Sequence, residues 1–416
     1  LIGKPSQEYG LPFPVVLRLS AGVNGARYLA LLRALVGIFM FGVQTFFISK
    51  SIGYLIRILI FKIDSNFLNQ DMFLVFYMGL NLIDLISLLI TLLLQFFIFS
   101  NGIEKNRVFI NFSAFFVYFG LILFLIIIIS ENYEELSLSI KLALNTKNVI
   151  SKTHLIPLLS IVGTMFAYFS ILIMNFGDFS RYVKDESDLN KGNFSLIINL
   201  VLFSLLSVLI VLGSDIILVK NFVEVENLLT NPTDIIGKFD NTFLTFVALV
   251  FILFATASTN LFATASTNLI ANYIPSQNAL LNFLPKHLSL KSSGILIIFF
   301  SFFIGFFWLS ILSQIGILSI IDTIGAFFGP IFGIIIADFY LIKNKQIINK
   351  DIFSSIPSSS YYYSNGWQIK GLYAIFIGFI FSSSTIWNIN LNFLQSFSWI
   401  IGAFVSWLTY YLLASK

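Results

Sequence analysis

The chain has 416 residues, of which 57% are hydrophobic and 11% charged, with a net charge of +4. A soluble protein carries about 25% charged residues, so this composition excludes a soluble globular domain and predicts an all-α polytopic membrane protein. The small charge spread over many loops argues against nucleic-acid binding, and the absence of cysteine argues against thiol chemistry and Cys-ligated metals.

The first segment is polar and punctuated by glycine and proline, reading GKPSQEYGLPFPVVLRLSAGVNGAR over 3–27. We interpret residues 1–25 as a cytoplasmic loop. A chain that starts with leucine inside such a loop resembles the middle of a protein, which predicts an N-terminal truncation.

Ten apolar runs follow, each long enough to cross a bilayer and each bounded by glycine, proline or charged residues. Segment 51–66 is also apolar, but it carries Arg57 and Lys62, and we interpret it as an interfacial piece. The ten runs cover 26–49, 72–100, 107–130, 155–177, 193–219, 241–274, 293–312, 316–342, 370–388 and 393–414.

Most lysines and arginines fall in loops that are cytoplasmic if the first loop is inside, as the positive-inside rule requires. The even number of spans then places both termini of the chain in the cytoplasm. We predict one transmembrane domain over 1–416, comprising a core over 26–342, a cytoplasmic loop over 343–369 and two C-terminal helices over 370–416.

The first span contains FMFGVQTFF, which places Gln44 in the middle of an apolar run. A carboxamide flanked by aromatic rings suits a planar heterocycle with adjacent N–H and C=O groups. A hydrogen bond from Gln44 to a neighbouring helix is the alternative.

Intramembrane carboxylates are candidates for function, and Asp84 and Asp322 are the clear ones. We expect Asp84 to pair with a neighbouring helix, and either a functional or an exposed interfacial position for Asp322. The motif NFGDFSRY carries Asp178 and Arg181, which we interpret as an ion pair at the surface or at a gate. No nucleophile and base accompany them, so we expect no catalytic site and no enzyme activity.

The sixth span is 34 residues long, because the unit FATASTNL occurs twice in succession, over 254–261 and 262–269. In the second copy Ala263, Ser266 and Thr267 share one helical face. Two hydroxyls and a main-chain carbonyl form an oxygen cluster suited to Na⁺. Close packing of small residues against another helix is the alternative.

Later in the chain, GAFFGPIFGIIIADFYLIKNK places Gly329 and Pro330 inside the eighth span. We expect this pair to break or kink the helix. Asp338 then marks its cytoplasmic end, at the membrane interface.

Together these motifs resemble the nucleobase–cation symport family, which carries purines, pyrimidines, hydantoins and allantoin. The segments that carry the resemblance are FGVQT, NFGDFSRYVK, ATASTNLIANYIP, FLPKHL and GPIFGIIIADFYLIK. The family has twelve spans in the leucine-transporter-like fold, which is built from two inverted repeats of five helices and two further helices. The resemblance implies that this chain holds family helices three to twelve.

The resemblance also implies site residues. Gln44 and Asn272 match the amides that hydrogen-bond the solute. Phe169 and Met40 fall where the family often has tryptophans that stack on it. Ala263, Ser266 and Thr267 match part of the family's sodium site, and the second copy of the repeat is the functional one, because IANYIP follows it.

The implied function is a secondary active transporter in the plasma membrane. It imports a uracil-, cytosine-, allantoin- or hydantoin-like solute with Na⁺ or H⁺ and uses no prosthetic cofactor. Its expected partners are this small molecule and the lipid bilayer. The alternatives are another leucine-transporter-like carrier, for amino acids or amines, and a polytopic membrane transferase.

Overall fold

The computed structural model describes residues 1–99, 118–123, 125–126, 128–130, 133–141, 152–220 and 268–415. Within these ranges the chain is helical, and the only β-structure is two isolated bridges. Six of the described helices are long and apolar enough to cross a membrane, or seven if one bent pair counts as a single span. Two of the ten predicted spans, 107–130 and 241–274, lie largely outside the described residues.

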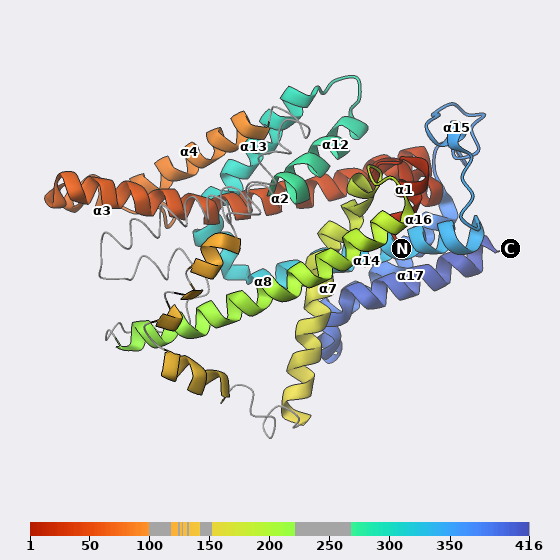
Figure 1. Cartoon of the computed structure of the whole chain (residues 1–416). Coiled ribbons are helices and arrows are strands. Elements are labelled where there is room, and N and C mark those ends of the chain that lie inside the picture. The colour runs from red at the N-terminus through yellow and green to blue at the C-terminus, as the bar shows by residue number, and fades with distance from the viewer. Residues whose placement is uncertain are drawn as a thin grey trace.

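The longest element is α2 (Phe13–Ile63), which runs across the molecule in red in Figure 1. It packs against α4 (Leu82–Phe99), α7 (Lys152–Ser180), α12 (Ile274–Phe283) and α13 (Leu290–Phe306). α8 (Glu186–Lys220) follows α7 along the chain. α2 therefore lies at the centre of this group of helices.

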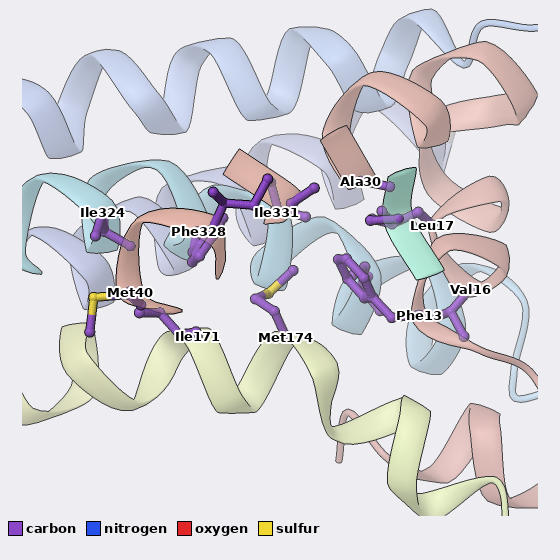
Figure 2. Packing of buried hydrophobic residues seen from close by; sticks show 14 of the residues in the cluster. Phe13, Val16, Leu17, Ala30, Met40, Ile171, Met174, Ile324, Phe328 and Ile331 are labelled. Atoms are coloured by element: carbon purple, nitrogen blue, oxygen red, sulfur yellow. The ribbon is translucent and has the colours of Figure 1, made fainter. Parts of the chain in front are cut away.

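A second group of helices is attached to α7 through α14 (Ile317–Ile336) and α17 (Ser398–Ala414). It also includes α16 (Ile369–Trp387), and the three helices contact one another. In Figure 2 the apolar core between α7, α2 and α14 contains Met40, Ile171, Ile324 and Phe328. These helices can form an apolar core with one another because apolar residues occupy most of their faces.

Short elements connect these helices. They are α1 (Lys4–Tyr9), η1 (Ser65–Asn69), α3 (Asp71–Leu74), η2 (Leu269–Tyr273), η3 (Trp308–Leu312), η4 (Ser313–Ile315), η5 (Ala337–Ile342), α15 (Asn349–Ile352) and η6 (Ile389–Phe397).

The prediction of a loop over 1–25 was wrong, since α1 and the first turns of α2 occupy this segment. Proline lies at the first or second helical position of both helices. There its missing N–H costs nothing and its fixed φ favours helix, so these prolines begin helices instead of excluding them.

Most of segment 51–66, which we interpreted as an interfacial piece, is the C-terminal part of α2, which continues to Ile63; its position relative to the membrane stays a prediction. The charge that suggested an interface is compensated within the fold. Arg57 donates a hydrogen bond of 2.6 Å to Asp84 on α4 and one of 3.2 Å to Asn81. The expected pairing of Asp84 with a neighbouring helix is thus confirmed.

Near its start α2 is interrupted at Gly22, whose backbone (φ 78°, ψ 176°) is open essentially only to glycine. The loop before α16 occupies the break. Gln368 N donates to Ala21 O at 2.9 Å, and Asn24 N donates to Gly366 O at 2.7 Å. A Cβ on Gly22 would lie 2.6 Å from Gly366 O, so only glycine admits this approach. The loop thereby satisfies backbone groups that the break leaves unpaired.

Candidate functional site

Gln44 and Asn272 lie 228 positions apart in the sequence, yet their side chains meet inside the fold. Asn272 Nδ2 on η2 donates a hydrogen bond of 3.2 Å to Gln44 Oε1 on α2. Asn272 is 2% exposed, whereas Gln44 is half-buried. The structure therefore brings together the two amides that the sequence assigned to one solute site.

Further buried polar groups extend this contact. Asn272 Nδ2 also donates to Asn268 Oδ1 at 2.9 Å. Asn268 Nδ2 in turn lies 3.2 Å from Phe41 O and 3.4 Å from Thr45 Oγ1, and Thr45 Oγ1 lies 2.8 Å from Gln95 Oε1 on α4. This chain of hydrogen bonds holds the Asn272 side chain in one rotamer. Thr45 and Gln95 were missed from the sequence, although a lone glutamine in the apolar run of α4 is the same signal that identified Gln44.

Two hydrogen-bonding atoms of the pair remain unused. Within the described residues, Asn272 Oδ1 accepts no hydrogen bond and Gln44 Nε2 donates none. The described residues thus leave one acceptor and one donor of this contacting pair without a partner, on two different elements.

The backbone around Asn272 departs from a regular α-helix. Residues Leu269–Tyr273 form a single π-helical turn, a geometry frequent at functional sites. Pro275 lacks an N–H, so the carbonyl of Ala271 has no donor four residues later. Arg33 Nη2 on α2 supplies one at 2.6 Å, and Asn175 Nδ2 on α7 approaches the same oxygen at 3.4 Å. Two other helices therefore hold this turn in place.

Glycines on α2 permit these contacts. A Cβ on Gly37 would overlap Ser276 Oγ and lie 2.5 Å from Arg33 Nη1. A Cβ on Gly42 would lie 2.7 Å from Ile304 of α13. Larger residues at either position would push α2 away from the elements that complete the site.

The two residues predicted to stack on the solute occupy different environments. Met40 is 5% exposed and lies among the apolar side chains between α2, α7 and α14 (Figure 2). Phe169 on α7 is half-buried, and its ring meets Tyr168 edge-on at 5.3 Å. The stacking role of both residues stays a prediction.

The predicted sodium ligands Ala263, Ser266 and Thr267 lie outside the described residues, as does the first copy of the repeat. Of the second copy, the structure describes Asn268 and Leu269. The choice between the two copies therefore also stays a prediction.

The predicted ion pair between Asp178 and Arg181 is absent from the described structure. Asp178 is 4% exposed, and its Oδ1 accepts a hydrogen bond of 3.0 Å from Phe13 N, at the start of α2. The Arg181 guanidinium lies over Tyr182 at 4.7 Å and donates to its hydroxyl. The carboxylate is used to satisfy an unpaired amide at a helix start, where negative charge is favoured.

Gly329 and Pro330 lie inside α14, which continues through both residues, so the pair does not break the helix, and the alternative prediction of a kink stays a prediction. A Cβ on Gly329 would overlap Trp399 O, so this glycine allows α17 to pack closely. Pro330 leaves the carbonyl of Ala326 without a helical donor. Ser382 Oγ on α16 donates to that oxygen at 2.9 Å, which replaces the missing bond.

We expect Ser382→Ala to destabilise the protein by about 1 kcal/mol, because the Ala326 carbonyl loses its donor in an apolar surrounding. Ser384→Ala is the matched control, since Ser384 Oγ bonds only within its own helix, to Phe381 O. Thermal unfolding of the purified variants in detergent measures the difference. Equal midpoints for the two variants would contradict this role of Ser382.

A family model described as permease for cytosine/purines, uracil, thiamine and allantoin matches residues 1–411. The chain belongs to this permease family. It is 26% identical to the purine-uracil permease NCS1 of Arabidopsis thaliana over 98% of this chain and 66% of that protein. It is 25% identical to the allantoin permease of Bacillus subtilis over 99% of this chain and 79% of that protein.

Solved structures of Mhp1 have the same fold. The inward-facing conformation matches with a TM-score of 0.62, and a closed conformation with bromovinylhydantoin bound matches with 0.65. Each structure is 16% identical to this chain. The alignments include at least 99% of this chain and 80% of each Mhp1 chain. The predicted leucine-transporter-like fold is confirmed.

As a member of the permease family with several long apolar helices, the chain is a multi-pass membrane protein. The family assignment favours a transporter over the membrane transferase.

Proposed function

We propose that this permease imports a nucleobase or a related planar nitrogenous heterocycle together with a cation, Na⁺ or H⁺, across the plasma membrane. Uracil, cytosine, allantoin and hydantoin represent the solute class. In this proposal both termini of the chain are cytoplasmic, and no prosthetic cofactor takes part.

The observation that carries the proposal is the open donor and acceptor of the Gln44–Asn272 pair. A cyclic amide or ureide presents an N–H beside a C=O. Its N–H can donate to Asn272 Oδ1 and its C=O can accept from Gln44 Nε2. The named substrates of the relatives include purines, uracil and allantoin, which carry such an edge or a close equivalent. An aliphatic amine has no matching acceptor.

The Gln44–Asn272 pair is also held in a fixed conformation, which favours solute binding as well as solute recognition. Asn272 is fixed by Asn268, and the turn that carries it is fixed by Arg33. Side chains that are already ordered lose little entropy when a solute binds. A cation that binds more tightly to the solute-competent state then drives uptake by differential affinity.

The test is uptake of labelled uracil, cytosine, allantoin and hydantoin by the full-length protein in liposomes, with each gradient imposed in turn. We expect saturable uptake of at least one of these solutes, accelerated by an inward Na⁺ or H⁺ gradient. Uptake indifferent to both gradients would refute cation coupling.

A further inference from the structure

Asp322 is a carboxylate inside α14, close to the end that the loop charges place outside. It is 3% exposed, so the fold withdraws it from solvent. This contradicts the exposed interfacial position that the sequence left open. A buried charge in a membrane span is costly unless it is compensated.

The two oxygens of Asp322 have unequal surroundings. Gln395 Nε2 on η6 donates to Oδ2 at 3.1 Å, and the Thr164 side chain on α7 also hydrogen-bonds the carboxyl group. Oδ1 is buried and has no hydrogen-bond partner among the described residues. Ser398 Oγ donates to the main-chain oxygen of Asp322 instead of its side chain.

No positive charge compensates the carboxylate in the part of the chain that the structure describes. The side chains that hydrogen-bond Asp322 are Thr164 of α7 and Gln395 of η6 on the carboxyl group and Ser398 of α17 on the main-chain oxygen, and none of them titrates near neutral pH. Neither ion pair nor charge interaction joins Asp322 to any described lysine, arginine or histidine. The group is therefore neutralised by something other than these side chains.

A proton fits this arrangement better than a metal cation. Oδ2 accepts hydrogen bonds as the carbonyl oxygen of a carboxylic acid does, which leaves Oδ1 to carry the proton. A hard cation needs several oxygen ligands around it. Here Gln395 presents its N–H to the acid, and no second carboxylate lies beside Asp322 among the described residues.

We propose that Asp322 is the residue that binds the coupling proton, an inference that rests on the proposed function. Protonation places a hydrogen on Oδ1, and deprotonation returns a charge to a site with no cation. The protonated acid therefore favours the closed α14–α7 contact that buries it. The deprotonated carboxylate favours an arrangement in which this contact is open.

The contact with α7 links this site to the solute site. Thr164 lies on α7, as do Phe169 and Asn175. α14 and α7 pack so closely that a Cβ on Gly325 would lie 2.6 Å from Ala167 Cβ. Phe166 of α7 also stacks on Trp399 of α17 at 5.8 Å. A change at Asp322 thus reaches the helix that borders the solute, and binding of proton and solute become linked.

Asp322→Asn tests the proposal, because it removes the titration and keeps the shape. The full-length variant in liposomes is measured in two ways: accumulation driven by a pH gradient, and counterflow of labelled against unlabelled solute at equal pH. For one proton per solute, a gradient of one pH unit supports about tenfold accumulation by the wild type. We expect the variant to lose accumulation and to keep counterflow within about threefold.

Thr323→Val is the matched control, since Thr323 is the next residue and its hydroxyl bonds only to Ser319 O of its own helix. It should keep both activities. Wild-type accumulation that ignores pH, or follows Na⁺ alone, would overturn the proposal, and so would undiminished pH-driven accumulation by Asp322→Asn. Absence of counterflow in the wild type for every solute would instead overturn the proposed function.

If Asp322→Asn loses counterflow as well, solute-induced proton uptake is measured on the purified wild type and on Asp322→Glu. A midpoint of proton uptake that shifts in the Glu variant supports the proposal, because a different acid now titrates. An unchanged midpoint, or no proton uptake, overturns it.

Discussion

Replacing Asn272 with leucine is expected to weaken solute binding by about 10- to 100-fold, because a buried partner of the solute's polar edge is lost. The volume stays similar, so the effect reports hydrogen bonding. Gln44 also loses the donor that holds its Oε1 at 3.2 Å. Equilibrium binding of labelled solute to the purified full-length protein measures the change.

Asn278→Leu is the matched control for this prediction. It makes the same chemical change on α12, and Asn278 is half-buried and six residues further along the chain. We expect its dissociation constant to stay within about twofold of the wild type. Equal weakening by both variants would show that the effect is general destabilisation and would remove Asn272 from the site.

Replacing Lys343 with methionine is expected to destabilise the protein by about 3–5 kcal/mol, because it leaves a buried charge without its counterion. Asp338 is fully buried and receives Lys343 Nζ on both oxygens, at 2.8 and 2.9 Å. Tyr410 donates a further bond of 2.6 Å. Asp338 is therefore the centre of a buried network near the end of its helix, and its predicted position at the membrane interface stays a prediction.

The same network reaches the start of α2. Lys343 Nζ and the Tyr363 hydroxyl both donate to Leu19 O, at 3.2 and 2.6 Å. Burial, together with the nearby Asp338 carboxylate, raises the pKa of Tyr363, so its phenol stays a neutral donor. Loss of Lys343 therefore also loosens the contact between the loop and the break at Gly22.

Lys345→Met provides the control for Lys343→Met, since Lys345 is exposed, lies over the ring of Tyr340 and otherwise has a charge interaction with the exposed Glu186. Its stability should change by less than about 0.5 kcal/mol. In the double variant Asp338→Asn/Lys343→Met, the loss should be smaller than the sum of the two single losses, because both remove one interaction. Additive losses in thermal unfolding would contradict a direct pair.

The sequence was sufficient for features that depend on local pattern. Apolar runs located most described helices to within a few residues, as for α7 and α16. Isolated amides in apolar runs identified Gln44 and Asn272, which the fold brings together. Such residues are conspicuous because an unpaired polar group in a membrane span is unfavourable.

The sequence was insufficient where one helix completes another. Pro275 and Pro330 each free a carbonyl, but only the fold shows that Arg33 and Ser382 supply the missing donors. Similarly, Asp338 is followed by lysine five residues later, and the sequence could not show that both are enclosed by α17 and the start of α2. These partners are distant in sequence, and no local pattern links them.

Solute counterflow at equal pH and equal ion concentrations is the most direct test of solute transport by this protein, because it requires solute binding and transport but no ion gradient. Liposomes containing the full-length protein are loaded with unlabelled solute and diluted into labelled uracil, cytosine, allantoin or hydantoin. We expect transient accumulation of label for at least one of them, lost in Asn272→Leu and kept in Asn278→Leu. No counterflow with any of the four, or full counterflow in Asn272→Leu, would contradict this expectation.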